Sequence, residues 1–199
     1  MKNLSEAFAA IFSDDDWFTK VLVGGLCVFF VLCGFGIILI NGYLVEFMKS
    51  ILKGNKDLPF WRGFSQIIKT GWKVSAALVL YYGIVTVMLY FSGVPVISLT
   101  VAITYFILHT TLHPLVLLAY AQSPKFATCF NPVKVLQPLR HAGKQIVSAL
   151  SLSAVFLFLS ITAGWMAIVV GWTLLVFLSL LIQNSAAAIA VRNHFASHS

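Results

Sequence analysis

Three long stretches of this 199-residue chain contain no aspartate, glutamate, lysine or arginine. They cover residues 21–45, 74–124 and 145–191, and aliphatic and aromatic side chains dominate each of them. A helix that crosses a bilayer needs about 20 mostly apolar residues, because the hydrocarbon layer is about 30 Å thick. Charged residues make up 10% of the chain, whereas a soluble domain has roughly 25%. The sequence therefore predicts an all-α integral membrane protein.

The lengths of these stretches predict a polytopic helix bundle with five transmembrane helices. The first stretch holds one span, and each of the other two holds two spans joined by a tight turn. Glycine and proline mark the middle turn at residues 92–95, and the last turn is placed near Gly164. Within a single membrane domain of residues 1–199, the predicted spans are 21–45, 74–91, 96–121, 147–163 and 165–191.

The basic residues between the predicted spans indicate the orientation. Eleven of the thirteen lysines and arginines fall on one side of a five-span arrangement, and neither opposite turn carries a charge. Because short loops rich in lysine and arginine stay in the cytoplasm, we expect this side to be the cytoplasmic side of the inner (plasma) membrane. The N-terminus would then lie outside and the C-terminus inside. The alternative is a first span broken at 34–36 into a re-entrant hairpin, which would bring Lys2 and Lys20 inside as well.

Three further segments have the periodicity of interfacial amphipathic helices, namely 3–12, 60–73 and 131–143. Asn131-Pro132 suits the N-cap and first residue of the third segment. Basic residues near a cytoplasmic leaflet attract anionic lipid by about 1 kcal/mol each. We therefore expect lipid-headgroup contacts from the basic residues of the second and third segments, which are Arg62, Lys69, Lys73, Lys134, Arg140 and Lys144.

A run of aspartates precedes the first apolar stretch. Ser13 suits an N-cap, and Asp14, Asp15 and Asp16 suit the first turn of the next helix, where carboxylates meet the positive end of the helix dipole. A divalent-cation site is the alternative interpretation. Consecutive aspartates on a helix point in different directions, which favours capping.

Two segments of the chain are similar to each other. Residues 71–78 read GWKVSAAL and residues 143–150 read GKQIVSAL, and each follows a span, a basic loop and an amphipathic stretch. Two parallel repeat units of this kind are typical of transporters. Chance recurrence of small, basic and apolar residues is the other explanation.

A series of short motifs resembles a known family. In chain order they are Asp16-Trp17, Gly24-Gly25, Gly42-Tyr43, Leu58-Pro59-Phe60-Trp61, Gly71, Pro114, Ala119-Tyr120-Ala121 and residues 126–130. Over nearly the whole chain they resemble the domain-of-unknown-function 4013 membrane proteins. The chain departs from that pattern at Asp15, where proline is expected, at Arg62, where the family tends to be acidic, and at the C-terminus, which lacks a glycine-glutamine close. The resemblance implies a bacterial or archaeal multi-span membrane protein and implies no activity.

His109 and His113 are candidate cofactor-binding residues. They lie four residues apart, on one face of the third predicted span. Ionisable residues at that depth are costly and indicate function by default, and this spacing suits a shared metal, a haem or a chlorophyll. No carboxylate or cysteine lies nearby in the sequence to complete a metal site. The alternative is a neutral histidine that bonds across a helix interface or to the carbonyl of Thr110, which Pro114 leaves without its helical donor.

Small residues at helical spacing predict a close helix contact. Gly164, Ala167 and Gly171 form such a stripe in the last predicted span and its turn. Stripes of this kind let helix backbones approach closely in a membrane. The contact could be made within the chain or with a partner.

The sequence carries no recognisable enzyme motif. It lacks a P-loop, a nucleophile elbow, an H-E-x-x-H motif and an acid pair, and it has six acidic residues in all. We therefore expect no enzyme activity, no catalytic residue, no metal site and no cofactor. Topology explains the net charge of +7, so no nucleic-acid partner is expected.

Three functions are compatible with these features. The leading expectation is a scaffold or accessory subunit of an inner-membrane complex, in contact with anionic lipids and other membrane protein subunits. The alternative is a small-solute or lipid transporter built on two parallel repeats. The second alternative is haem, chlorophyll or metal binding through His109 and His113. A mid-membrane cavity lined by both repeats would favour transport, and a flat apolar surface without a cavity would favour the scaffold.

Overall fold

The structure is a computed structural model that describes residues 2–55, 57–93, 95, 98–163 and 169–196. The described residues form helices and connecting loops and contain no strand, so the predicted all-α class is confirmed. The elements are α1 (Lys2–Phe12), α2 (Trp17–Phe29), the short 3₁₀ helix η1 (Phe30–Cys33), α3 (Phe35–Leu52), α4 (Phe64–Phe91), α5 (Leu99–Gln122), α6 (Phe126–Phe130), α7 (Pro132–Ala163) and α8 (Val169–Ala196).

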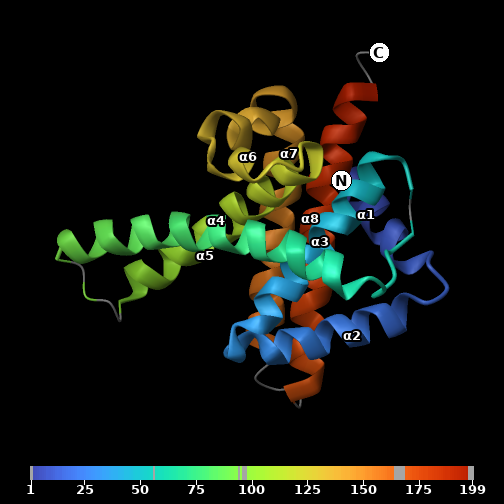
Figure 1. The fold of residues 1–199 in the computed structure, drawn as a ribbon, viewed down its shortest axis with the longest axis horizontal. Helices are drawn as coiled ribbons and strands as arrows, with labels where there is room; N and C mark the ends of the chain where they lie inside the picture. Colours follow the sequence, from blue (N-terminus) through green and yellow to red (C-terminus); the bar gives the residue numbers. More distant parts are fainter. Residues whose placement is uncertain (1, 56, 94, 96–97, 164–168, 197–199) are drawn as a thin grey trace.

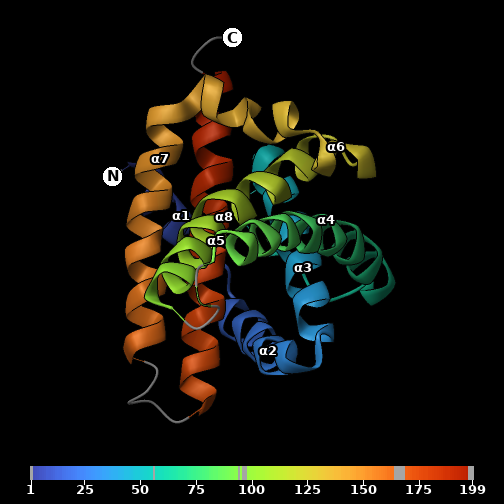
Figure 2. The same cartoon turned by 90° about the vertical axis from the view of Figure 1, so that its left-hand side faces the viewer.

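Among the described residues, four helices are long and apolar enough to cross a membrane. They are α3, α4, α5 and residues 173–196 of α8. Figures 1 and 2 show that α7 and α8 lie side by side, whereas α4 and α5 form a hairpin that runs across them and projects from the rest of the molecule. The long helices therefore do not share one direction.

Helix α8 is the centre of the fold. It packs against α1, α2, α3, α5 and α7, and all of its residues from 179 to 191 are buried. Most of this stretch is aliphatic or alanine. An apolar helix with short side chains can be covered on every side, because its neighbours can approach closely.

The first predicted span, 21–45, is not one helix. Helix α2 ends at Phe29, η1 follows, and α3 begins at Phe35. The break lies at Gly34, whose φ of 75° is in the left-handed region that only glycine adopts without cost. The prediction of one continuous span is wrong, and the break falls where the hairpin alternative placed it.

Helix α1 packs beside the C-terminal part of α8 (Figure 1). Arg192 near the end of α8 forms an ion pair with Glu6 of α1 at 3.2 Å, and the amide of Asn193 donates to Asn3. The sides of the membrane on which the two termini lie stay a prediction.

Two of the predicted interfacial helices are continuous with the spans that follow them. Helix α4 begins at Phe64 and runs to Phe91, so residues 64–73 of the predicted interfacial helix share one helix with 74–91, while 60–63 belong to the loop before it. Helix α7 likewise joins 131–143 to 147–163, with an irregular residue at Ala142 (φ −118°, ψ 30°). The helical backbone continues through both parts of α4, whereas α7 is kinked at Ala142, between its amphipathic and apolar parts.

The start of α7, the buried face of α1 and the start of α2 test three further predictions. Asn131 caps α7 as predicted, because its side-chain oxygen accepts the backbone N–H of Val133 at 3.0 Å. Helix α1 forms as predicted, but it buries Ala7 and Ile11 and packs against α8. The prediction that the aspartates begin the next helix is wrong, since α2 begins only at Trp17.

Candidate functional site

The described structure contains a large apolar groove. It has a volume of about 870 Å³ and lies between α2, η1 and α3 on one side and α4 and α5 on the other, with contributions from α7 and α8. Its apolar lining consists of Val28, Phe29, Val31, Ile37, Ile40, Leu78, Val79, Phe106, Leu157, Val176 and Leu180. Its polar lining, called the polar strip below, consists of Asn41, Ser75, Tyr82, Tyr105, His109 and His113.

Three buried residues of the polar strip form a hydrogen-bonded chain. The ring nitrogen Nε2 of His113 lies 2.9 Å from Oδ1 of Asn41, and Nδ2 of Asn41 donates to Oγ of Ser75 at 2.9 Å. His113 is 4% exposed, Asn41 3% and Ser75 7%. The other ring nitrogen of His113, Nδ1, is buried and has no partner within the described structure. A buried polar atom without a partner is uncommon and needs a specific explanation.

The other half of the polar strip is aromatic. The hydroxyl of Tyr82 lies 3.1 Å from Nδ1 of His109, and the rings of Tyr82 and Tyr105 stack with centroids 5.8 Å apart. The hydroxyl of Tyr105 also contacts the hydroxyl of Thr86. The rings of His109 and His113 lie 4.7 Å apart, so the two halves of the strip meet at the two histidines.

Two glycines bring α3 and α4 together under the polar strip. A Cβ atom at Gly42 would overlap the carbonyl oxygen of Ile67, and one at Gly71 would overlap the carbonyl oxygen of Ile38. The helices can cross this closely only because both positions lack a side chain. The crossing places Asn41 and Ser75 within hydrogen-bond distance.

Pro114 and Gln183 hold α5 against α8. Proline has no N–H, so the carbonyl of Thr110 loses its helical donor, and the side-chain amide of Gln183 donates to that oxygen at 2.7 Å. The sequence indicated that Pro114 frees this carbonyl, but the partner is Gln183 and not a histidine. His113 instead bonds across a helix interface, as the alternative interpretation expected.

The histidine pair lies in the groove but is not joined by other metal ligands. Among the described residues, no group of three histidine, cysteine, aspartate or glutamate side chains could hold a metal ion. One ring nitrogen of each histidine already has a hydrogen-bond partner. Haem or chlorophyll binding through His109 or His113 stays a prediction.

The other predicted site residues lie away from the groove. The basic residues Arg62, Lys69, Lys73, Lys134, Arg140 and Lys144 are all exposed. Gly164 and Ala167 lie outside the described residues, and Gly171 is half-buried in α8. Lipid-headgroup contact and helix packing by these residues stay predictions.

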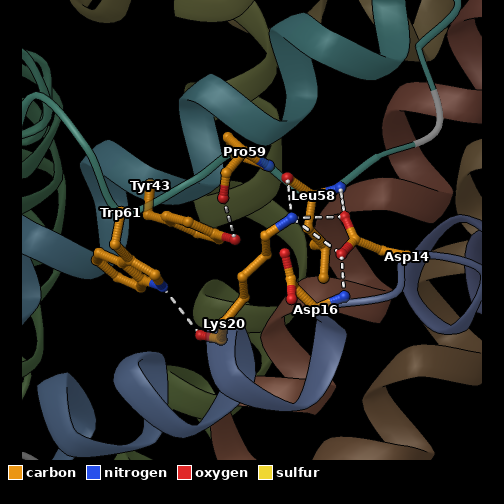
Figure 3. A network of polar contacts seen from close by, with 7 residues as sticks. All are labelled: Asp14, Asp16, Lys20, Tyr43, Leu58, Pro59 and Trp61. Carbon is orange, nitrogen blue, oxygen red and sulfur yellow. Dashed lines mark hydrogen bonds and ion pairs between the residues drawn. The ribbon is translucent and has the colours of Figure 1, made fainter.

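An ion pair that the sequence did not reveal lies buried beside α2 (Figure 3). Nζ of Lys20 lies 2.7 Å and 2.9 Å from the two carboxylate oxygens of Asp14, and the two side chains are only 5% and 6% exposed. Lys20 also donates to the carbonyl of Leu58 at 3.0 Å, and Asp14 accepts the N–H groups of Leu58 and Asp16, each at 2.9 Å. Both charges are therefore paired and hydrogen-bonded, as buried charges must be.

Aromatic residues extend this network to α3. Nε1 of Trp61 donates to the carbonyl of Lys20, and the hydroxyl of Tyr43 donates to the carbonyl of Pro59, each at 2.9 Å (Figure 3). The rings of Tyr43 and Trp61 stack at 4.1 Å. The network connects α2, α3 and the loop before α4, so its role in the fold is to fix that loop.

The sequence contained one indirect signal for this network. The motifs Asp16-Trp17, Gly42-Tyr43 and 58–61, quoted above for the family resemblance, supply most of its residues. Asp14 and Lys20 were assigned to capping and topology, because sequence spacing alone does not show that they face the same loop.

Comparison with known proteins gives one match. A family model described as "Protein of unknown function (DUF4013)" matches residues 25–170. Searches among curated proteins and among solved structures found no match. The matched segment contains α3, α4, α5 and most of the groove lining.

Proposed function

The chain belongs to the DUF4013 family of proteins of unknown function, and we propose that it is an integral membrane protein that binds a lipid-like molecule in the apolar groove. The observation that carries the proposal is a groove of about 870 Å³ whose lining is apolar apart from six uncharged polar residues. Ligand pockets typically have volumes of about 300–1,000 Å³, with mostly hydrophobic walls and a few polar groups that orient the ligand.

The surroundings of the groove support entry from a bilayer. Its walls include residues of α3, α4, α5 and α8, the four helices among the described residues that are long and apolar enough to cross a membrane. Val79 and Ile37 line the groove and are 71% and 43% exposed, so the apolar wall is continuous with the outer surface. A lipid-like molecule could therefore enter from the hydrocarbon layer without crossing water.

The basic residues support a cytoplasmic orientation for one end of the molecule. The end of α3, helix α6, the start of α7 and the end of α8 lie at the same end in both views (Figures 1 and 2). These segments and their loops include Lys49, Lys125, Lys134 and Arg192. Since cytoplasmic segments are rich in lysine and arginine, we place this end, with α1 and the end of α8, on the cytoplasmic side of the plasma membrane. The exposed residues Lys69 and Lys73 of α4 and Arg62 of the loop before it, together called the α4 basic group below, would contact anionic headgroups.

The groove favours lipid binding or transport over a role as a scaffold. It is lined by α3 and α4 of the first proposed repeat unit and by α5 and α7 of the second, which is the arrangement that the sequence associated with transport. The scaffold role stays a prediction. The exposed apolar residues at the far end of the α4–α5 hairpin, such as Phe91 and Leu99, suit lipid tails as well as a partner helix.

Photolabelling tests the proposed binding. The purified protein in lipid nanodiscs is incubated with hexadecanol that carries a diazirine in its chain, illuminated, digested and analysed by mass spectrometry. We expect labelling of groove-lining peptides that unlabelled hexadecanol suppresses. Uniform labelling of all apolar surfaces, without competition, would contradict the proposal.

Two matched variants make this test specific. Val79→Trp fills the groove from α4 and should abolish the competed labelling. Val87→Trp places the same side chain two turns further along the same helix, where Val87 is 54% exposed and is not part of the groove lining. Labelling of the groove should be unchanged in this control.

A further inference from the structure

The groove contains no charged side chain within the described part of its lining. Glu46, an acidic residue further along α3, lies outside the lining and is paired with Lys49 at 2.8 Å. A charged group in an apolar environment is very unfavourable unless it has a counter-charge. A phosphate, a carboxylate or an ammonium group on the ligand would have no such partner in the groove, and this favours a ligand whose polar group in the groove is uncharged.

The hydrogen bonds of Asn41 determine which nitrogen of His113 carries the proton. The amide Nδ2 of Asn41 is engaged as a donor to Ser75, which leaves Oδ1 as the atom that faces His113. Because Oδ1 can only accept, Nε2 of His113 must be the N–H donor. A neutral imidazole with its proton on Nε2 has a lone pair on Nδ1. This tautomer is assigned from the hydrogen-bond network.

His113 therefore presents an acceptor that the protein does not satisfy. Nδ1 is buried and unpartnered, and the residue is only 4% exposed although it lines the groove. The hydroxyl of Tyr82, another member of the polar strip, is engaged with His109 at 3.1 Å. The partner that His113 lacks is an O–H or N–H donor.

We propose that the ligand of the groove is an uncharged lipid alcohol whose hydroxyl donates a hydrogen bond to Nδ1 of His113. This inference rests on the proposed function, because it names the chemistry of the same ligand. The class includes long-chain and isoprenoid alcohols and acylglycerols, and it excludes phospholipids and fatty acids as occupants of the groove. The apolar walls would take the chain, and the polar strip would take the hydroxyl.

A series of ligands with the same chain length tests the inference on the unmodified protein. Hexadecanol, hexadecyl methyl ether, 2-hexadecanone and palmitate each compete with the diazirine probe for the groove peptides. A hydrogen bond to a neutral acceptor changes affinity by about three- to tenfold. Hexadecanol should therefore compete at about three- to tenfold lower concentration than the ether and the ketone, and palmitate should compete least.

A pair of variants shows whether His113 is the acceptor. His113→Phe removes both ring nitrogens. In this variant hexadecanol and the ether should compete at about the same concentration, so the preference for the alcohol is lost while the ether still competes. His113→Gln keeps an amide donor for Asn41 and a free acceptor oxygen, so part of the alcohol preference should return. The ligand series on the unmodified protein still decides the question if His113→Phe does not fold.

The outcomes separate the two proposals. If alcohol and ether compete equally in the unmodified protein, the inference about the hydroxyl is overturned while lipid binding in the groove stands. If the ketone competes better than the alcohol, Nδ1 carries the proton and the inference is overturned. If none of the four ligands competes, the proposed function fails together with the inference.

Discussion

Replacing Lys20 by methionine should destabilise the protein strongly. Methionine keeps most of the length and the apolar stem of lysine but removes the charge that neutralises Asp14. The carboxylate of Asp14 would stay buried, with the N–H groups of Asp16 and Leu58 as its only remaining partners among the described contacts, and the carbonyl of Leu58 would lose its donor.

The size of the expected stability loss in Lys20→Met follows from the burial of the Lys20–Asp14 ion pair. Breaking a buried ion pair by removing one partner costs about 3–5 kcal/mol. Because two N–H donors still stabilise the Asp14 carboxylate, we expect the lower value, about 3 kcal/mol. For a chain of this size, 1 kcal/mol corresponds to a change in Tm of about 2–4 °C, so the expected fall is about 6–12 °C.

The assay is thermal unfolding of the purified protein in one detergent, followed by circular dichroism. Lys49→Met is the matched control, because Lys49 pairs with Glu46 at a similar distance of 2.8 Å while the two side chains are 20% and 29% exposed. A pair that is open to solvent contributes about 0–1 kcal/mol, so for this half-buried pair we expect Tm to change by at most about 4 °C.

A double variant separates charge from packing. In Asp14→Asn/Lys20→Met the buried negative charge is gone, while the side-chain oxygen of the new amide can still accept an N–H group. We expect the double variant to recover at least half of the stability that is lost in Lys20→Met. Equal Tm values for Lys20→Met and Lys49→Met would refute the reasoning, because the fully buried pair would then contribute no more stability than the half-buried one.

Three further predictions concern α4, the loop before it and α6. Gly71→Ala should destabilise the protein by about 1–3 kcal/mol, because its Cβ would overlap the Ile38 carbonyl oxygen. Gly83→Ala, with open space around its Cβ, should stabilise the protein by about 0.5–1 kcal/mol. If thermal unfolding shows a change of the same sign for both variants, the close crossing of α3 and α4 is contradicted. Burial raises the pKa of the Cys129 thiol to about 11. The stabilisation that the neutral, buried thiol contributes is fully present below the pKa of the unfolded thiol, about 8.5. It is lost as pH rises through the pKa of the folded thiol. Alkylation of Cys129 by iodoacetamide, followed by mass spectrometry, should stay slow until pH approaches 11, and a half-maximal rate near the ordinary thiol value of about 8.5 would show that the thiol is not buried. Replacing all three residues of the α4 basic group by glutamine should reduce the anionic lipid that co-purifies, since each basic residue contributes about 1 kcal/mol near an anionic surface; an unchanged lipid content would contradict headgroup contact by these residues.

Local sequence signals predicted several features of the fold correctly. The charge-free stretches predicted long apolar helices, and Asn131-Pro132 predicted the start of α7. Gly34 was recognised as a place where the first stretch could break. These features depend on residues close together in the chain, so spacing and composition are enough to identify them.

The groove could be predicted only in part. His109 and His113 were singled out because histidines within an apolar helix are unusual. Asn41 and Ser75 were not, because a single amide or hydroxyl in an apolar run carries no signal of its partner. Asn41 is 72 residues from His113 and 34 from Ser75 along the chain, and they meet only because two glycines let α3 and α4 cross.

Residue types alone were enough to establish an all-helical chain with few charges and long apolar stretches, because the cost of exposing apolar surface or burying charge is a property of each side chain. Which polar groups find partners depends instead on how the helices pack. Packing paired Lys20 with Asp14 and Leu58, bonded Gln183 to the carbonyl that Pro114 frees, and left Nδ1 of His113 without a partner in the described structure. A hydrogen bond requires two atoms within about 3 Å, and residues distant in the chain reach that separation only when the helices are packed.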